Sequence, residues 1–189
     1  AFESYGKEQS YNAPISDSAM FKYTTALNHL LARGSKNRIQ IGDTTTVFWA
    51  ETEKKTCENL VMSFIDSIDE PDETRKPEKV PKRQQDPATR ELVNAVLEKV
   101  RTGKPLAEVD IGVDPDTTNF YILGLSPNNA RLAVRFWYRD NFGNFITHLA
   151  RHHLDMEIGP DDRRARLISM YWLLKQTVPE GSKEAAASP

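Results

Sequence analysis

The sequence predicts an α+β fold, in which several amphipathic helices pack against an antiparallel sheet. Residues 120–139 form two apolar runs joined by a short segment rich in proline and asparagine, which is the pattern of a β-hairpin. Around this hairpin, helical and strand patterns follow one another without the regular alternation of a parallel α/β fold.

The first expected element is a helix that begins at Ser16 or Asp17 and stops at Gly34. Short polar residues cap the start of a helix, and glycine favours its end. The apolar residues spaced to share one face of this helix are Met20, Leu27, Leu30 and Leu31.

Two strands and a second helix are expected next. A Gly-Asp turn follows residues 38–41, and Thr44–Ala50 is rich in β-branched and aromatic residues, which favour strands. A helix then covers residues 57–65, with Cys57 at one of its core positions. Its other apolar positions are Leu60, Val61, Phe64 and Ile65.

Further helices flank the hairpin. Asp86 is expected to cap a helix whose first residue is Pro87, and Gly103 is expected to end it. Another helix is predicted over residues 142–156 and a last one around residues 167–172. The face of the first of these helices that we expect to be buried carries Leu92, Val93, Val96, Leu97 and Val100.

A charged segment at residues 66–85 divides the chain. Prolines stand among charged residues there, so the segment has almost nothing to bury, and we expect a solvated, mobile loop that proteases cut first. Residues 1–65 and 86–178 are expected to form two halves that share one core. Residues 179–189 are expected to form a disordered tail.

Composition limits the function classes. Lys and Arg total 25 against 27 Asp and Glu, a formal net charge of -2, so strong non-specific nucleic-acid binding by the whole chain is not expected. The single cysteine excludes an intramolecular disulfide and fits a reducing, cytoplasmic compartment. No apolar run approaches the roughly 20 residues that a membrane span needs, and no secretory leader is evident. Both ends of the chain read as cuts through a longer polypeptide.

The strand at residues 131–139 carries the most suggestive functional pattern. Strict alternation assigns one face to the core, comprising Leu132, Val134, Phe136 and Tyr138. The opposite face then carries Arg131, Ala133, Arg135, Trp137 and Arg139. Guanidinium groups interleaved with an indole can hold a phosphate backbone and stack on bases. The same face also fits an ordinary solvated surface, or one covered by a neighbouring domain through carboxylates.

A polar segment near the N-terminus offers further candidates. Residues 4–12 are dense in hydrogen-bonding side chains, but Glu8 follows Lys7 where a P-loop requires Ser or Thr. The segment either contacts phosphates or forms an ordinary loop that leads into the first helix. Together, the candidate nucleic-acid-binding residues are Lys7, Gln9, Lys36, Arg38, Asn128, Asn129, Arg131, Arg135, Trp137 and Arg139.

Three histidines on the 142–156 helix raise the alternative of a metal site. His148 and His152 are four residues apart and share a face, with His153 beside them, but Leu149 stands where a zinc protease has glutamate. An ordinary helix face is the favoured interpretation. No Gly-x-Ser-x-Gly nucleophile motif is present, and no catalytic residue, metal or cofactor is predicted.

Five long, ordered strings carry a family resemblance. They are residues 1–9 (AFESYGKEQ), 12–14 (NAP), 22–28 (KYTTALN), 41–51 (IGDTTTVFWAE) and 120–137 (FYILGLSPNNARLAVRFW). They resemble the middle portion of the large subunit of the subtype I-C CRISPR Cascade surveillance complex.

The resemblance implies a non-enzymatic subunit of an RNA-guided DNA-surveillance complex in antiviral defence. In such complexes the guide RNA reads the sequence, while protein reads a short adjacent duplex motif and holds the opened strands. The implied partners are other Cascade subunits, the guide RNA, the target DNA and a helicase-nuclease, and no membrane.

Nucleic-acid binding within such a complex is the leading hypothesis. The alternative is a protein–protein scaffold domain of a multi-subunit assembly with no direct nucleic-acid contact. A histidine-based metal hydrolase is the third hypothesis. The surroundings of the strand at residues 131–139 distinguish the first two.

Overall fold

The computed structural model describes residues 15–65, 86–129 and 131–157, together with Met170, Leu173 and Thr177. The chain divides into two compact units, residues 1–35 and 36–189, and each is described by itself. The loop expected at residues 66–85, most of the helix expected around 167–172 and the tail at 179–189 lie outside the described residues.

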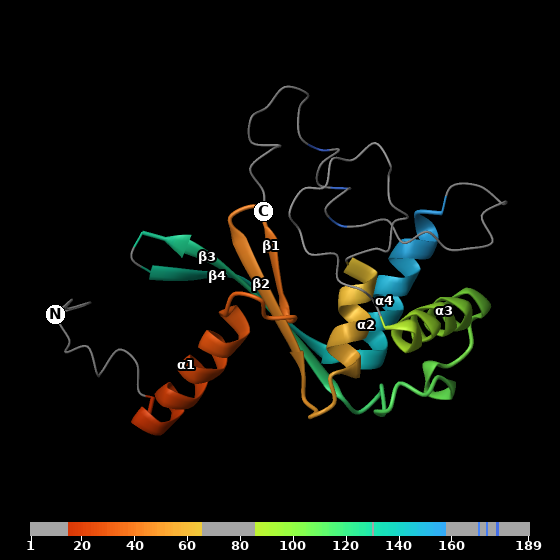
Figure 1. Ribbon diagram of the computed structural model, residues 1–189, viewed down its shortest axis with the longest axis horizontal. Coiled ribbons are helices and arrows are strands. Elements are labelled where there is room, and N and C mark those ends of the chain that lie inside the picture. The colour runs from red at the N-terminus through yellow and green to blue at the C-terminus, as the bar shows by residue number, and fades with distance from the viewer. Residues whose placement is uncertain are drawn as a thin grey trace. The chain divides into compact units, whose positions relative to one another are not determined.

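The described element of the first unit is α1 (Asp17–Leu31), shown in Figure 1. Ser16 caps it, because the Ser16 hydroxyl oxygen accepts a hydrogen bond from the backbone N–H of Ala19 at 3.2 Å. The helix ends at Leu31 rather than at Gly34, since Ala32 already has an extended ψ of 145°. None of the α1 residues is buried.

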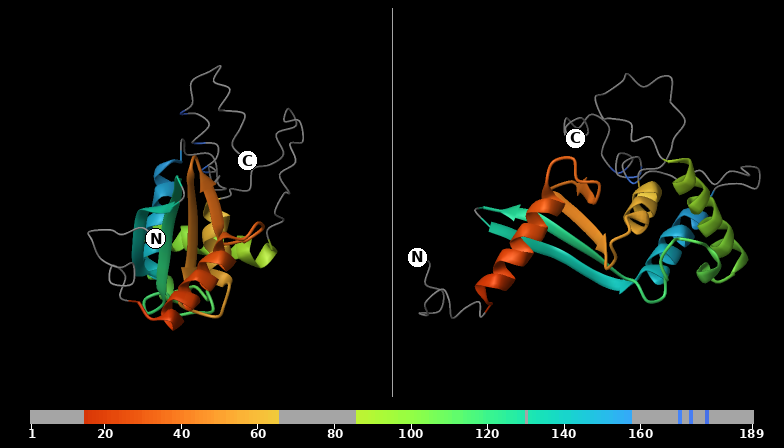
Figure 2. Two further views of the ribbon diagram at one scale, coloured as in Figure 1. Left: turned by 90° about the vertical axis from the view of Figure 1, so that its left-hand side faces the viewer. Right: turned by 60° about the horizontal axis from the view of Figure 1, so that its bottom comes forward.

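The second unit contains a four-stranded antiparallel sheet with strand order β1-β2-β3-β4 (Figures 1 and 2). Each strand pairs with the next one along the chain. The prediction of an α+β fold with an antiparallel sheet and a hairpin near residues 120–139 is therefore confirmed. The strands are β1 (Arg38–Ile41), β2 (Thr44–Ala50), β3 (Asn119–Asn128) and β4 (Arg131–Asn141).

Helices cover only part of this sheet. The helices are α2 (Thr56–Ile65), α3 (Pro87–Thr102) and α4 (Phe142–Asp155), with the short 3₁₀ helix η2 (Leu106–Glu108) after α3. The sheet contacts α2 and α4, and α3 packs on these two helices. Figure 2 shows the three helices gathered at one end of the sheet, while the β3–β4 hairpin continues beyond them. Among the described helices of the second unit, none covers the far half of the hairpin.

The hydrophobic core lies between the helices and the sheet, with Phe120 of β3 near its centre. The Phe120 ring stacks on Phe145 with centroids 4.8 Å apart, and it also contacts Phe142 at 5.6 Å and Phe48 at 6.1 Å. Cys57 is fully buried in this core, as its helical spacing predicts. Other buried members include Leu60, Val61, Phe64, Val93, Val96, Leu97, Ile111, Ile146 and Ala150.

Both ends of α3 follow local rules of the sequence. The Asp86 side chain accepts a hydrogen bond from the N–H of Ala88 at 3.4 Å, Pro87 is the first residue of α3, and Gly103 ends the helix with a left-handed φ of 67°. These three predicted positions are confirmed. Within the described residues, no helix combines the length and the apolar character that crossing a bilayer requires.

Candidate nucleic-acid interface

The sheet face opposite the helices carries an aromatic cluster. Phe48 belongs to the core, so the next residue, Trp49, points to the other face. The register pairs Trp49 with Tyr121 and Tyr121 with Arg139, which places these three side chains in one row across β2, β3 and β4. Trp137, two residues before Arg139, lies in the neighbouring row of the same face.

The rings of Trp49, Tyr121 and Trp137, which we call the aromatic cluster, are in mutual contact. Trp49 and Tyr121 stack with centroids 5.3 Å apart and planes at 15°. Trp137 lies 5.7 Å from Trp49 and 5.8 Å from Tyr121, with tilted planes. The Arg139 guanidinium carbon is 5.7 Å from the Tyr121 centroid, a cation–π distance. Trp137 is 54% exposed, so its ring is accessible to a ligand.

A carboxylate borders the aromatic cluster on one side. Glu51 Oε2 accepts hydrogen bonds from Asn119 Nδ2 at 2.8 Å and from the Tyr121 hydroxyl at 3.1 Å. The hydrogen bond from Asn119, then that from Tyr121 and the charge of Arg139, hold the Glu51 pKa below its usual value. An ionised Glu51 repels phosphate, so a nucleic-acid backbone fits better on the side of Trp137 and Arg139.

A β-bulge in β4 changes the predicted arrangement of the arginines. The β3–β4 register shifts between Gly124 and Leu125. Gly124 pairs with Phe136 and Leu125 pairs with Val134, so Arg135 is an extra residue in the ladder. The extra residue reverses the alternation, so side chains before Arg135 point to the faces opposite to those expected from the side chains after it.

The predicted five-residue face of Arg131, Ala133, Arg135, Trp137 and Arg139 is consequently wrong. Trp137 and Arg139 share their face with Leu132 and Val134, and Arg131 lies on the other face. The predicted core face is also wrong, because Leu132, Val134 and Phe136 are 62%, 63% and 44% exposed. The reason is that this part of the hairpin extends beyond the helices, as Figure 2 shows.

Arg135 is directed to neighbouring protein groups and not to the aromatic cluster. Its Nε donates a hydrogen bond to Ser126 Oγ at 2.6 Å, and its terminal nitrogen lies 3.5 Å from a carboxylate oxygen of Asp43. Asp43 is in the turn between β1 and β2. Both members of this ion pair are more than half exposed, so the pair contributes little to stability.

The remaining predicted residues are spread over the unit. Arg38 pairs with Val47, Val47 pairs with Leu123, and Leu123 pairs with Trp137. These residues form one row across the sheet, so Arg38 lies on the face of the aromatic cluster. Lys36 is exposed just before β1. Asn128 and Asn129 are exposed at the hairpin tip, where Asn129 has a left-handed φ of 53°. Lys7 and Gln9 lie outside the described residues.

Trp49, Tyr121 and Glu51 were not among the residues that the sequence analysis assigned to the site. Alternation around the apolar Phe48 indicates that Trp49 points away from the core. Which side chains then become its neighbours depends on the β2–β3 and β3–β4 registers, and these follow from tertiary pairing.

The comparison with known families decides the protein's class. All of residues 1–189 match the family model of a CRISPR-associated protein, Cas_Csd1. The chain belongs to the Cas_Csd1 family. This membership confirms the CRISPR association that the sequence resemblance implies. No curated protein matches the sequence.

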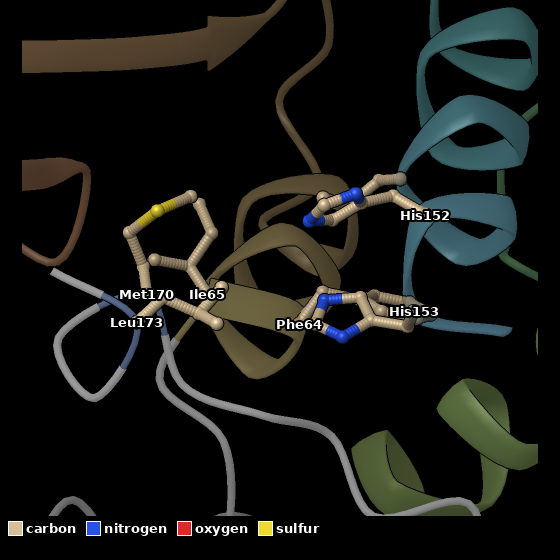
Figure 3. Close-up of a pocket in the computed structure, with 7 residues that line it drawn as sticks. Phe64, Ile65, His152, His153, Met170 and Leu173 are labelled. Atoms are coloured by element: carbon tan, nitrogen blue, oxygen red, sulfur yellow. The ribbon is translucent and has the colours of Figure 1, made fainter. Parts of the chain in front are cut away.

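The histidines of the predicted alternative metal site lie on α4 of this Cas_Csd1 family member. His153 is buried beside Phe64, with ring centroids 5.5 Å apart (Figure 3). Burial, and secondarily the charge of His152, lower the His153 pKa to about 4. The adjoining cavity measures about 10 Å³, which is room for about one water. Among the described residues, no group of three or more His, Cys, Asp or Glu is placed to hold a metal ion.

Proposed function

We propose that this chain is a non-catalytic part of the large subunit of a CRISPR RNA-guided DNA-surveillance complex, the Cascade complex of subtype I-C. In this proposal it contacts guide RNA or target DNA, together with other Cascade subunits, in the cytoplasm. Its roles in recognition of the adjacent duplex motif and in docking of the helicase-nuclease rest on the sequence resemblance.

The aromatic cluster with Arg139 carries the proposal of nucleic-acid contact. The exposed Trp137 ring contacts both members of the stacked pair of Trp49 and Tyr121, which restricts its motion, so little conformational entropy is lost when a base stacks on it. Base stacking on an aromatic side chain contributes about 1–3 kcal/mol per base. Arg139 adds a positive charge that can release counterions from a phosphate.

Family membership supplies the context for this chemistry, because CRISPR effectors work on RNA and DNA. The near-neutral net charge of -2 indicates a local contact and not a broad electrostatic surface. A narrow basic–aromatic site within a larger assembly is consistent with both observations.

Variants of the cluster test the proposal in a binding titration with a fluorescent single-stranded oligonucleotide. Trp137→Ala is expected to weaken binding by about 5- to 150-fold, the equivalent of about 1–3 kcal/mol. Arg139→Ala is expected to flatten the plot of log affinity against log salt by about one unit. Arg90→Ala, on an exposed position of α3, is the matched control and should bind as the unmodified chain does. Unchanged affinity and salt slope in both cluster variants would refute the proposal.

The second candidate function is a protein–protein scaffold. The observation that favours it is the high exposure of Leu132 and Val134, since apolar side chains on a long exposed strand often mark protein contacts. A chain whose cluster variants bind nucleic acid normally but no longer join the assembly would support this second function.

A further inference from the structure

A fixed hydrogen-bond acceptor stands beside the aromatic cluster. Glu51 Oε2 accepts hydrogen bonds from Asn119 Nδ2 and from the Tyr121 hydroxyl, and these two bonds hold the carboxylate in one orientation. In the described part of the chain, the other carboxylate oxygen, Oε1, accepts no hydrogen bond. Glu51 is also exposed. Its Oε1 is therefore an oriented acceptor that a donor group of a ligand can reach.

Tyr121 connects this acceptor to the stacking surface. Its ring centroid lies 5.8 Å from that of Trp137, and its hydroxyl donates to Glu51. The Glu51 N–H donates to the Asn119 carbonyl at 2.8 Å, so Glu51 continues the pairing of β2 with β3 on the face of the aromatic cluster. A single strand with one base stacked on Trp137 therefore passes the carboxylate of Glu51.

Charge determines which part of the nucleotide meets this carboxylate. Glu51 directly follows β2, Arg139 is in β4, and Tyr121 of β3 lies between them. A guanidinium attracts phosphate, and a carboxylate repels it. The sugar–phosphate backbone therefore lies toward Arg139, and the base edges point toward Glu51.

An ionised carboxylate distinguishes bases by the donors on their edges, because it can only accept hydrogen bonds. The hydrogen bond from Asn119, then that from Tyr121 and the charge of Arg139, hold the Glu51 pKa below its usual value, so the group is ionised at neutral pH. Cytosine, adenine and guanine each carry an exocyclic amino group, which donates. Thymine and uracil carry carbonyl oxygens instead, and a carboxylate repels these.

We propose that the aromatic cluster and Glu51 together select a nucleotide whose base carries an exocyclic amino group over one that carries uracil or thymine. The amino group donates to Glu51 Oε1 while the strand stacks on Trp137 and its backbone lies toward Arg139. This inference rests on the proposed function, because it specifies which bases the same site prefers. It assigns Glu51 to the interface as the residue that determines specificity.

Two oligonucleotides that differ only in the base edge test this selection by fluorescence titration of the full 189-residue chain at neutral pH. Oligodeoxycytidine and oligodeoxyuridine have pyrimidine rings of the same size, and both lack the ribose 2′-hydroxyl, which is another donor that a carboxylate can bind. We expect the chain to bind oligodeoxycytidine at least about tenfold more tightly, since a hydrogen bond to a charged group replaces a repulsive contact.

Variants of the carboxylate locate the origin of the preference. Glu51→Gln keeps the size of the side chain and can still accept from Asn119 and Tyr121. Its amide both donates and accepts, so it can pair with either base, and we expect the preference to fall to about twofold or less. Glu53→Gln removes the same charge at an exposed position between β2 and α2, and as the matched control it should keep the full preference. Trp137→Ala should weaken binding of both oligonucleotides.

The outcomes separate this inference from the proposed function. Equal affinity for the two oligonucleotides, with binding that still depends on Trp137, would overturn the inference and leave the proposed function intact. A preference that persists in Glu51→Gln would overturn it as well. So would a Glu51-dependent preference for oligouridine over oligodeoxyuridine without one for oligodeoxycytidine, because the carboxylate would then bind the sugar. Failure of the unmodified chain to bind either oligonucleotide would refute both proposals.

Discussion

The surroundings of individual side chains decide their chemistry in this chain. The Cys57 thiol is fully buried, and this burial raises its pKa to about 12, so the thiol stays protonated and unreactive. His153 is 6% exposed, and its Nδ1 has no hydrogen-bond partner in the described residues. Burial lowers its pKa to about 4, which keeps the imidazole neutral at neutral pH.

The buried His153 is expected to make stability depend on pH. Its pKa falls from 6.5 in the unfolded chain to about 4 in the folded one, so between these values the unfolded state binds the extra proton. Stability therefore rises with pH across this window and is lost as the pH falls through it. At about 1.4 kcal/mol per pKa unit, the full loss is roughly 3 kcal/mol.

Urea denaturation at several pH values between neutral and pH 4 measures this loss. His153→Leu should lack this part of the pH dependence, whereas His29→Gln, at an exposed position on α1, should retain it. An unaltered pH dependence in His153→Leu would show that other groups are responsible.

A single β-bulge in β4 determines which side chains share a face of the β3–β4 hairpin. The bulge at Arg135 turns Leu132 and Val134 to the face that also carries Trp137 and Arg139. Close to the bulge, the Phe136 ring lies directly over Gly124, a contact that a side chain at residue 124 would prevent. Glycine at this position therefore permits the local packing of the hairpin.

Gly124→Ala is expected to destabilise the chain by displacing the Phe136 ring. A Cβ at residue 124 would lie 2.3 Å from the nearest ring atom of Phe136, so the ring must shift to make room for it. Such overpacking typically costs about 1–3 kcal/mol. Combining Gly124→Ala with Phe136→Ala should remove most of this extra cost, which a double-mutant cycle in chemical denaturation measures. Strictly additive effects would contradict this account.

Stability of the second unit depends on a core that joins segments far apart in the sequence. Phe120 of β3 contacts Phe48 of β2 and Phe142 and Phe145 of α4. The core thus connects residues on both sides of the charged segment 66–85. The α1 helix of the first unit, in contrast, has no buried residue.

Replacing a buried phenylalanine of the second unit and an exposed one of α1 should have different effects on the free energy of unfolding. Phe120→Ala is expected to lower the free energy of unfolding by about 3–5 kcal/mol, because a fully buried ring leaves a cavity. Phe21→Ala, at a position on α1 that is 70% exposed, should change it by less than about 0.5 kcal/mol. Thermal denaturation of both variants tests the contrast, and equal losses would contradict it.

Local chemistry in the sequence was enough to predict both ends of α3, the hairpin and the α+β class. Asp86, Pro87 and Gly103 act through their own backbone neighbours, so their roles can be recognised without any tertiary contact. Cys57 could be placed in the core for a similar reason, because helical spacing of apolar residues defines a buried face. The resemblance of several long strings to a CRISPR subunit led to the CRISPR association, which the family match confirms.

Only the tertiary structure decided which residues form the candidate interfaces. Alternation within β4 predicted a single arginine-rich face. The bulge at Arg135 arises from pairing with β3, so the sequence of β4 alone does not reveal it. The rings beside Trp137 are those of Trp49 in β2 and Tyr121 in β3. The strand registers that bring them together depend on how the whole unit packs. Exposure of Leu132 and Val134 likewise depends on where the helices end over the sheet, which is a property of the packed layers and not of the strand's own sequence.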